Sequence, residues 1–196
     1  MKKKMLLGMV AAALLAGPLT AAQAVPVLTI DASGHLTGAT GVVVGSNTYN
    51  VTFQAGTCQS LFNGCVQSAF DFTTREEVLD AAAALLNTVL LDSALGAFDT
   101  HPELINGCTN PSFCFVVMPL ELGGPTGLMI GSALNFFDET GDSAECCSPV
   151  FTDQLLGRAL TVADWELATP VPEPGTLALL CLSLAGLGLI RRRRAA

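Results

Sequence analysis

Four acidic residues lie close together between positions 138 and 145, and they form the densest group of possible metal ligands in the sequence. They are Asp138, Glu139, Asp142 and Glu145. Hard oxygen ligands of this kind are the ones that calcium prefers. The spacing differs from an EF-hand, because the glycine and the last glutamate stand in other positions. The segment therefore predicts either a calcium site or a solvated acidic loop, and no other cofactor is expected.

Cysteines are the second group of residues that could carry chemistry. Six of them lie in the middle of the chain, namely Cys58, Cys65, Cys108, Cys114, Cys146 and Cys147. An even number in an exported segment is typical of disulfides. Structural zinc sites usually have cysteine pairs two to four residues apart. The intervals here are longer or zero, so zinc is not expected.

Turn signals favour two local pairings among these cysteines. Asn63 and Gly64 lie between Cys58 and Cys65, and an Asn-Pro turn lies between Cys108 and Cys114. The adjacent pair Cys146 and Cys147 either forms a vicinal bridge or reaches other parts of the chain. Swapped pairings stay open at this point.

No recognisable catalytic motif occurs in the sequence. His101 could be combined with Ser132 and Asp99 into a hydrolase constellation, but nothing in the sequence brings them together. The G-x-S-x-G, H-E-x-x-H and G-x-x-x-x-G-K-[ST] patterns are all missing. We therefore expect a protein that is not an enzyme. A small secreted hydrolase with an unidentified site is kept as an alternative.

The two ends of the chain carry targeting segments. Residues 1–24 combine three lysines, an apolar stretch and the triplet Ala22, Gln23, Ala24, which predicts a signal peptide cut by signal peptidase. Residues 177–190 form an uncharged apolar run that spans about 21 Å as a helix. This is short for a bilayer core of about 30 Å, but snorkelling and local thinning absorb such a mismatch. A transmembrane helix over residues 177–190 is therefore predicted.

A basic cluster follows this apolar run. It consists of Arg191, Arg192, Arg193 and Arg194. The positive-inside rule keeps such a cluster cytoplasmic and places the preceding residues on the other side of the membrane. Both ends therefore predict export of the middle of the chain, held at the membrane by the C-terminal helix before processing.

The order of features in residues 171–196 resembles the PEP-CTERM sorting tail of exported proteins in Gram-negative bacteria. Pro172, Glu173 and Pro174 match its defining tripeptide, and the apolar helix and the arginine cluster follow in the same order. The resemblance implies processing near the tripeptide by exosortase, often in bacteria that make exopolysaccharide. The same tail is sometimes labelled after ice-binding proteins. The threonines of this chain follow no fixed period, so ice binding is not expected.

These features divide the chain into a signal peptide (1–24), an exported domain (25–170) and a sorting tail (171–196). The exported domain holds two basic residues, Arg75 and Arg158, against 16 acidic ones, so its net charge is −14. Such a charge repels nucleic acid, which is excluded as a partner.

Hydrophobic patterning predicts an α+β domain of one antiparallel sheet with one main amphipathic helix packed on it and disulfide-stapled loops. Strands are expected at residues 27–31, 35–44, 48–54, 113–122, 128–137 and 159–167. The helix begins near Thr74, where Thr73 or Thr74 with Glu76 or Glu77 three residues later forms a capping box. Residues 138–149 are expected to be a loop.

The favoured function is that of a non-enzymatic cell-surface or extracellular-matrix protein, sorted by exosortase and associated with exopolysaccharide. A secreted module that binds calcium or another ligand is the first alternative, and the hydrolase is the second.

Overall fold

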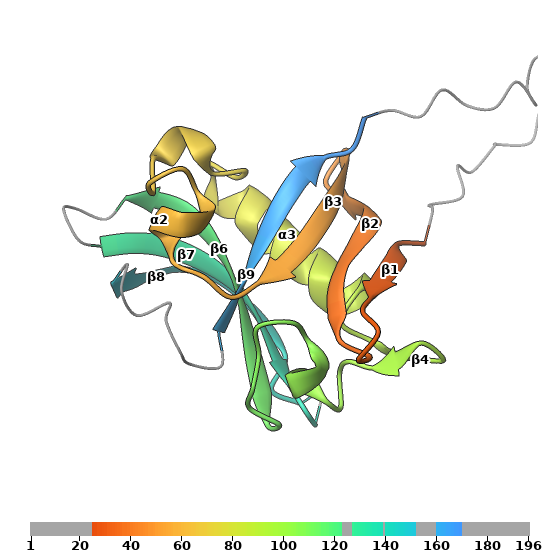
Figure 1. Ribbon diagram of the computed structural model, residues 1–196. Helices are drawn as coiled ribbons and strands as arrows, with labels where there is room; N and C mark the ends of the chain where they lie inside the picture. The colour runs from red at the N-terminus through yellow and green to blue at the C-terminus, as the bar shows by residue number, and fades with distance from the viewer. Residues whose placement is uncertain (1–24, 123–126, 139, 152–159, 170–196) are drawn as a thin grey trace, which may run out of the picture.

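The computed structural model describes residues 25–122, 127–138, 140–151 and 160–169. The predicted signal peptide, sorting tail and transmembrane helix lie outside these residues. The described chain is built around one seven-stranded β-sheet, with a single long helix on one of its faces (Figure 1). The prediction of a sheet with one main helix and disulfide bridges is confirmed at this level.

The sheet has the strand order β1-β2-β3-β9-β6-β7-β8. The strands are β1 (Val27–Ile30), β2 (Leu36–Val44), β3 (Asn47–Gln54), β6 (Phe113–Leu122), β7 (Gly127–Phe136), β8 (Ser143–Phe151) and β9 (Leu160–Leu167). A separate small hairpin joins β4 (Asp92–Ser93) and β5 (Gly96–Ala97). The last strand of the described chain therefore lies in the middle of the sheet, between β3 and β6.

The expectation of a purely antiparallel sheet is wrong at one pair of strands. β9 runs parallel to β6, whereas the five other neighbouring pairs are antiparallel. β9 pairs with β3 along six residues in the antiparallel sense, and this longer pairing sets its direction. Three residue pairs then join it to β6 in the parallel sense.

The long helix α3 (Arg75–Thr88) begins where the capping box predicted. The amide of Glu77 donates to Thr74 Oγ1 at 3.3 Å, and the amide of Thr74 donates to Glu77 Oε2 at 3.0 Å. The helix buries one apolar side against the sheet, made of Val78, Ala81, Ala82 and Leu85. A Cβ at Gly131 of β7 would overlap the side chain of Val78, so this glycine lets the helix lie close to the sheet.

A shorter segment covers part of the opposite face of the sheet. It contains α2 (Cys58–Leu61) and the 3-10 helix η1 (Gln67–Ala69), and neither was predicted from the sequence. Phe62 and Phe70 of this segment join Val117, Ile130 and other side chains of the sheet in a second apolar cluster. A third short helix, η2 (Pro102–Leu104), lies in the irregular stretch before β6.

The prediction of a loop over residues 138–149 is wrong for most of its length. Residues from Ser143 onward form β8, which pairs with β7 at the edge of the sheet. This strand has few β-branched residues and contains Pro149, which an edge strand can accommodate because its outer side needs no ladder hydrogen bond. Pairing with β7 therefore creates a strand that the local sequence did not indicate. In the described part of the chain, no helix has the length and apolar character needed to cross a membrane.

Candidate functional site

An open cavity of about 540 Å³ lies at the turn between β2 and β3, next to the end of β9. Six of the residues that line it have uncharged polar side chains, and we call this site the hairpin groove. They are Thr40, Ser46, Asn47, Thr48, Asn50 and Thr169. The β2–β3 hairpin and the residues around the end of β9, which are far apart in the sequence, therefore meet in one site of hydroxyl and amide groups.

A β-bulge in β2 shapes the floor of the hairpin groove. Ala39 pairs with Val51 and Val42 pairs with Tyr49, so Thr40 and Gly41 together lie opposite the single residue between those two partners. Gly41 has a φ angle of 79°, which glycine adopts without strain. Bulges bend a strand locally and redirect its side chains. Here the bulge brings Thr40 to the groove.

The hairpin groove opens on the sheet face that α3 does not cover. Tyr49, Val51 and Phe53 of β3 pack in the core cluster with α3, so the alternating residues of β3 point to the opposite face. In Figure 1, α3 lies behind β3 and β9, and no other helix of the described chain lies in front of them. The groove side chains are exposed or half-buried, and within the described residues they make no hydrogen bonds to the protein. Their donors and acceptors are available to a ligand.

A second cavity, of about 640 Å³, lies beside the C-terminal half of α3. Asp92, Asp99 and Asp142 line it together with residues of α3 and the first residues of β8, and we call it the acidic cavity. No lysine or arginine lines it in the described part of the chain. The two cavities thus differ in charge, one being strongly acidic and the other neutral.

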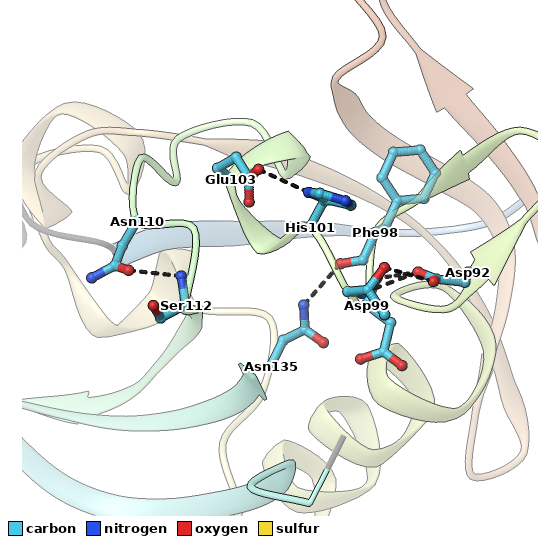
Figure 2. A network of polar contacts seen from close by, with 9 residues as sticks. Asp92, Phe98, Asp99, His101, Glu103, Asn110, Ser112 and Asn135 are labelled. Atoms are coloured by element: carbon cyan, nitrogen blue, oxygen red, sulfur yellow. Dashed lines mark hydrogen bonds and ion pairs between the residues drawn. The ribbon is translucent and has the colours of Figure 1, made fainter. Parts of the chain in front are cut away.

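One wall of the acidic cavity is held by a network of polar contacts (Figure 2). The Asp92 carboxylate accepts hydrogen bonds from the amides of Asp99 and Thr100 at 3.0 and 3.1 Å, and from Thr100 Oγ1 at 2.7 Å. Although desolvation acts in the other direction, these hydrogen bonds hold the pKa of Asp92 below its usual value. Asn135, which is fully buried, donates through Nδ2 to the carbonyl oxygen of Phe98 at 2.9 Å. Through its three hydrogen bonds, the Asp92 carboxylate therefore stabilises this wall of the cavity.

The three described acidic residues of the predicted calcium loop lie in different parts of the structure. Asp138 lies in the turn after β7, Glu145 lies on β8, and Glu139 is outside the described residues. Asp142 lines the acidic cavity, and its Oδ1 accepts a hydrogen bond from the amide of Phe136 at 2.7 Å. Among the described residues, no group of three or more histidine, cysteine or acidic side chains is placed to hold a metal ion. The calcium site stays a prediction.

Sequence reasoning did not find one carboxyl group with a strongly shifted pKa. Asp71 is exposed as a residue, yet its Oδ2 accepts a hydrogen bond from the amide of Trp165 at 3.3 Å. Desolvation of the carboxyl group by the surrounding protein, helped by the nearby charge of Asp164, raises the pKa of Asp71 to about 6. Desolvation and the charge of Glu166 also raise the pKa of Asp164. Asp71 and Asp164 therefore lie close together outside the lining of the hairpin groove.

The residues of the hypothetical hydrolase constellation make other contacts. The ring of His101 is exposed, and its Nδ1 lies 3.1 Å from Glu103 Oε1. Ser132 is buried on β7, where it pairs with Val117 and Glu145 on the two neighbouring strands. In the structure, His101 therefore contacts Glu103, and Ser132 lies inside the sheet.

All six cysteines of the described domain are paired in disulfides. Cys58 bonds Cys65 and Cys108 bonds Cys114, as the turn signals favoured. The adjacent cysteines of β8 form the vicinal bridge. The bridge coincides with a β-bulge. Cys146 and Ser148, the residues on either side of Cys147, pair with consecutive residues of β7. None of these six cysteines therefore offers a thiolate for catalysis or for metal binding.

The sorting residues Pro172, Glu173 and Pro174 and the arginine cluster Arg191, Arg192, Arg193 and Arg194 lie outside the described residues, so they are known by sequence alone. No curated protein and no solved structure matches this chain. Residues 170–194 match the PEP-CTERM protein-sorting motif. The chain therefore carries the C-terminal sorting signal of exported proteins that exosortase recognises.

Proposed function

We propose that this protein is a non-enzymatic component of the cell surface or extracellular matrix, delivered by exosortase and associated with exopolysaccharide. The PEP-CTERM motif at residues 170–194 is the observation that carries the proposal. The domain before the motif is the cargo, and its role is to bind rather than to transform its partner.

The disulfides support an extracellular place of work. Disulfides persist in oxidising compartments and are rare in the cytosol. Three bridges within a domain of this size, each closed between cysteines close in sequence, suit a protein that folds after export. The acidic balance of the domain also favours solubility outside the cell.

The absence of free thiols among the described residues supports a binding role. Cysteine nucleophiles act as thiolates, and the six described cysteines are all bonded to one another. A binding role asks only for an accessible surface of suitable chemistry, and the uncovered face of β3 provides one.

The proposal is tested in the bacterium that produces the protein by deleting its exosortase. We expect the full-length chain to accumulate in the membrane fraction, because the sorting tail is no longer processed. A Pro172→Ala, Glu173→Ala, Pro174→Ala variant should behave in the same way in the parent strain. The exposed Glu121→Ala substitution is the control and should leave processing unchanged. Unaltered gel mobility and unaltered location after the deletion would refute the proposal.

Calcium binding is the second candidate function, and it is suggested by the acidic run of residues 138–145. Asp142 of this run lines the acidic cavity, although no three acidic side chains of the described residues are arranged to hold a metal ion. Isothermal calorimetry with calcium, compared between the parent protein and Asp142→Asn, tests this candidate. Binding heat that the substitution removes would support it, and no heat with the parent protein would exclude it.

A further inference from the structure

We propose that the hairpin groove binds neutral sugar residues of a polysaccharide. The inference rests on the proposed function, which names a polysaccharide as the partner, and adds the site and the kind of sugar. The volume of the hairpin groove lies within the usual range of about 300–1,000 Å³ for ligand pockets.

The side chains of the groove match the chemistry of sugars. A hydroxyl group of threonine or serine both donates and accepts hydrogen bonds, and an asparagine amide does so through separate atoms. Sugar hydroxyls have the same double capacity, so each can be satisfied by such a partner. Because the side chains of Thr40, Thr48 and Asn50 make no hydrogen bonds to the described protein, a ligand breaks no internal side-chain bond of theirs when it binds.

Charge limits the ligand to neutral sugars. None of the residues that line the groove is ionisable, whereas the domain as a whole is strongly acidic. Glu166 of β9 pairs with Asn50, and Asp164 pairs with Thr52 one position further along the same face. A polymer of uronic acids would approach these two carboxylates and be repelled. A neutral chain meets no such penalty.

Hydrogen-bonded backbone supports the groove, because β3 lies between two neighbouring strands. β3 is hydrogen-bonded to β2 and β9, and the amide of Ala168 donates to the carbonyl oxygen of Thr48 at 2.9 Å. A binding site that is ordered before the ligand arrives loses less conformational entropy on binding. Thr169 lines the groove and directly precedes the sorting motif in the sequence.

The test measures binding of the detergent-solubilised full-length protein to immobilised oligosaccharides. The probes are hexamers of glucose, mannose, galactose and N-acetylglucosamine, and an alginate hexamer serves as the anionic probe. We expect at least one neutral hexamer to bind, with a dissociation constant on the order of 1 mM for so small a ligand. The alginate hexamer should bind at least tenfold more weakly.

Two pairs of variants assign the binding to the groove. Thr48→Ala should weaken it about tenfold, whereas Thr52→Ala, on the same strand and face but outside the groove, should stay within about twofold. Asn50→Ala should also weaken binding about tenfold, because it removes an amide donor and acceptor from the groove. Gln67→Ala removes an amide group at an exposed position outside the groove and should have no effect. Thermal unfolding of each variant verifies that it is folded.

The outcomes separate this inference from the proposed function. Neutral-sugar binding that survives both groove substitutions would refute the groove as the site and leave exosortase-dependent delivery and polysaccharide association intact. Stronger binding of alginate than of every neutral hexamer would refute the choice of neutral sugars. Exosortase-dependent processing should be the same in all four variants. If deletion of exosortase leaves processing unchanged, that result counts against the proposed function alone.

Discussion

The two faces of β3 have opposite characters, although they are built from alternating residues of one short strand. On the face toward α3, Tyr49 contacts Trp165 and Phe72 with ring centroids 5.9 and 5.6 Å apart, and Phe53 is fully buried. On the other face Thr48, Asn50 and Thr52 are exposed or half-buried and carry no charge. One face of the strand holds the domain together, and the other is free to contact a partner.

This difference teaches how a small domain can combine stability with a binding surface. A strand at the centre of a sheet is fixed by hydrogen bonds on both sides, so its polar side chains are held in place without needing contacts of their own. Substitutions on the two faces should therefore separate stability from binding.

The largest expected effect comes from the buried face. Phe53→Ala should lower the free energy of unfolding by about 3–5 kcal/mol, because it removes a fully buried ring and leaves a cavity. Thr52→Ala, its neighbour on the open face, should change it by less than about 0.5 kcal/mol. Urea unfolding followed by circular dichroism measures both. Similar losses for the two variants would contradict the division between the faces.

A moderate effect is expected from the bridge that holds the small apolar cluster of α2. Cys58→Ala combined with Cys65→Gly should cost about 2 kcal/mol, because the closed loop is short. Glycine suits position 65, where φ is 61°. Hydrogen exchange should then show that α2 and η1 lose protection while α3 keeps it. Equal loss of protection in α3 would mean that the two faces unfold as one unit.

The smallest effect concerns Asp71, which bonds the backbone of β9 at the boundary of the two faces. Its raised pKa means that the folded state holds the proton more tightly than the unfolded state. Stability is therefore lost as the pH rises from about 4 to about 6, and the cost persists above that range. Asp71→Asn should raise the melting temperature at pH 7.5 and leave it unchanged at pH 3.5. The gain should stay below about 1 kcal/mol, because the residue is exposed and solvent screens its charge.

A melting temperature of Asp71→Asn that tracks the parent protein at both pH values would show that the carboxyl group is fully solvated. Asp164→Asn provides a comparison, since desolvation and Glu166 raise its pKa in the same direction.

Local signals in the sequence predicted several elements correctly. The alternation over residues 48–54 predicted β3, the capping box predicted the start of α3, and turn residues favoured the two local disulfides. Each of these features depends on residues close together in the chain. The strand β8 was missed because its stability comes from pairing with β7, and the parallel pairing of β9 with β6 was missed for the same reason.

The candidate site was less accessible from the sequence than the fold. The acidic run drew attention because its carboxylates are close in sequence, yet of the three that the structure describes, Asp138 lies in a turn, Asp142 precedes β8 and Glu145 lies on β8. The hairpin groove had no such signal. Its residues are ordinary polar ones, and only the exposed positions of β3 could have suggested it.

The sequence by itself determined that this protein carries a sorting tail, because a processing enzyme reads that tail as a short, contiguous motif. It also determined the acidic charge and the supply of cysteines, which depend on composition alone. The tertiary structure alone decided that Thr40, Asn50 and Thr169 meet in one groove. The insertion of β9 beside β3 brings Thr169 to two residues of the hairpin that lie more than a hundred positions before it, and no local pattern encodes such a contact.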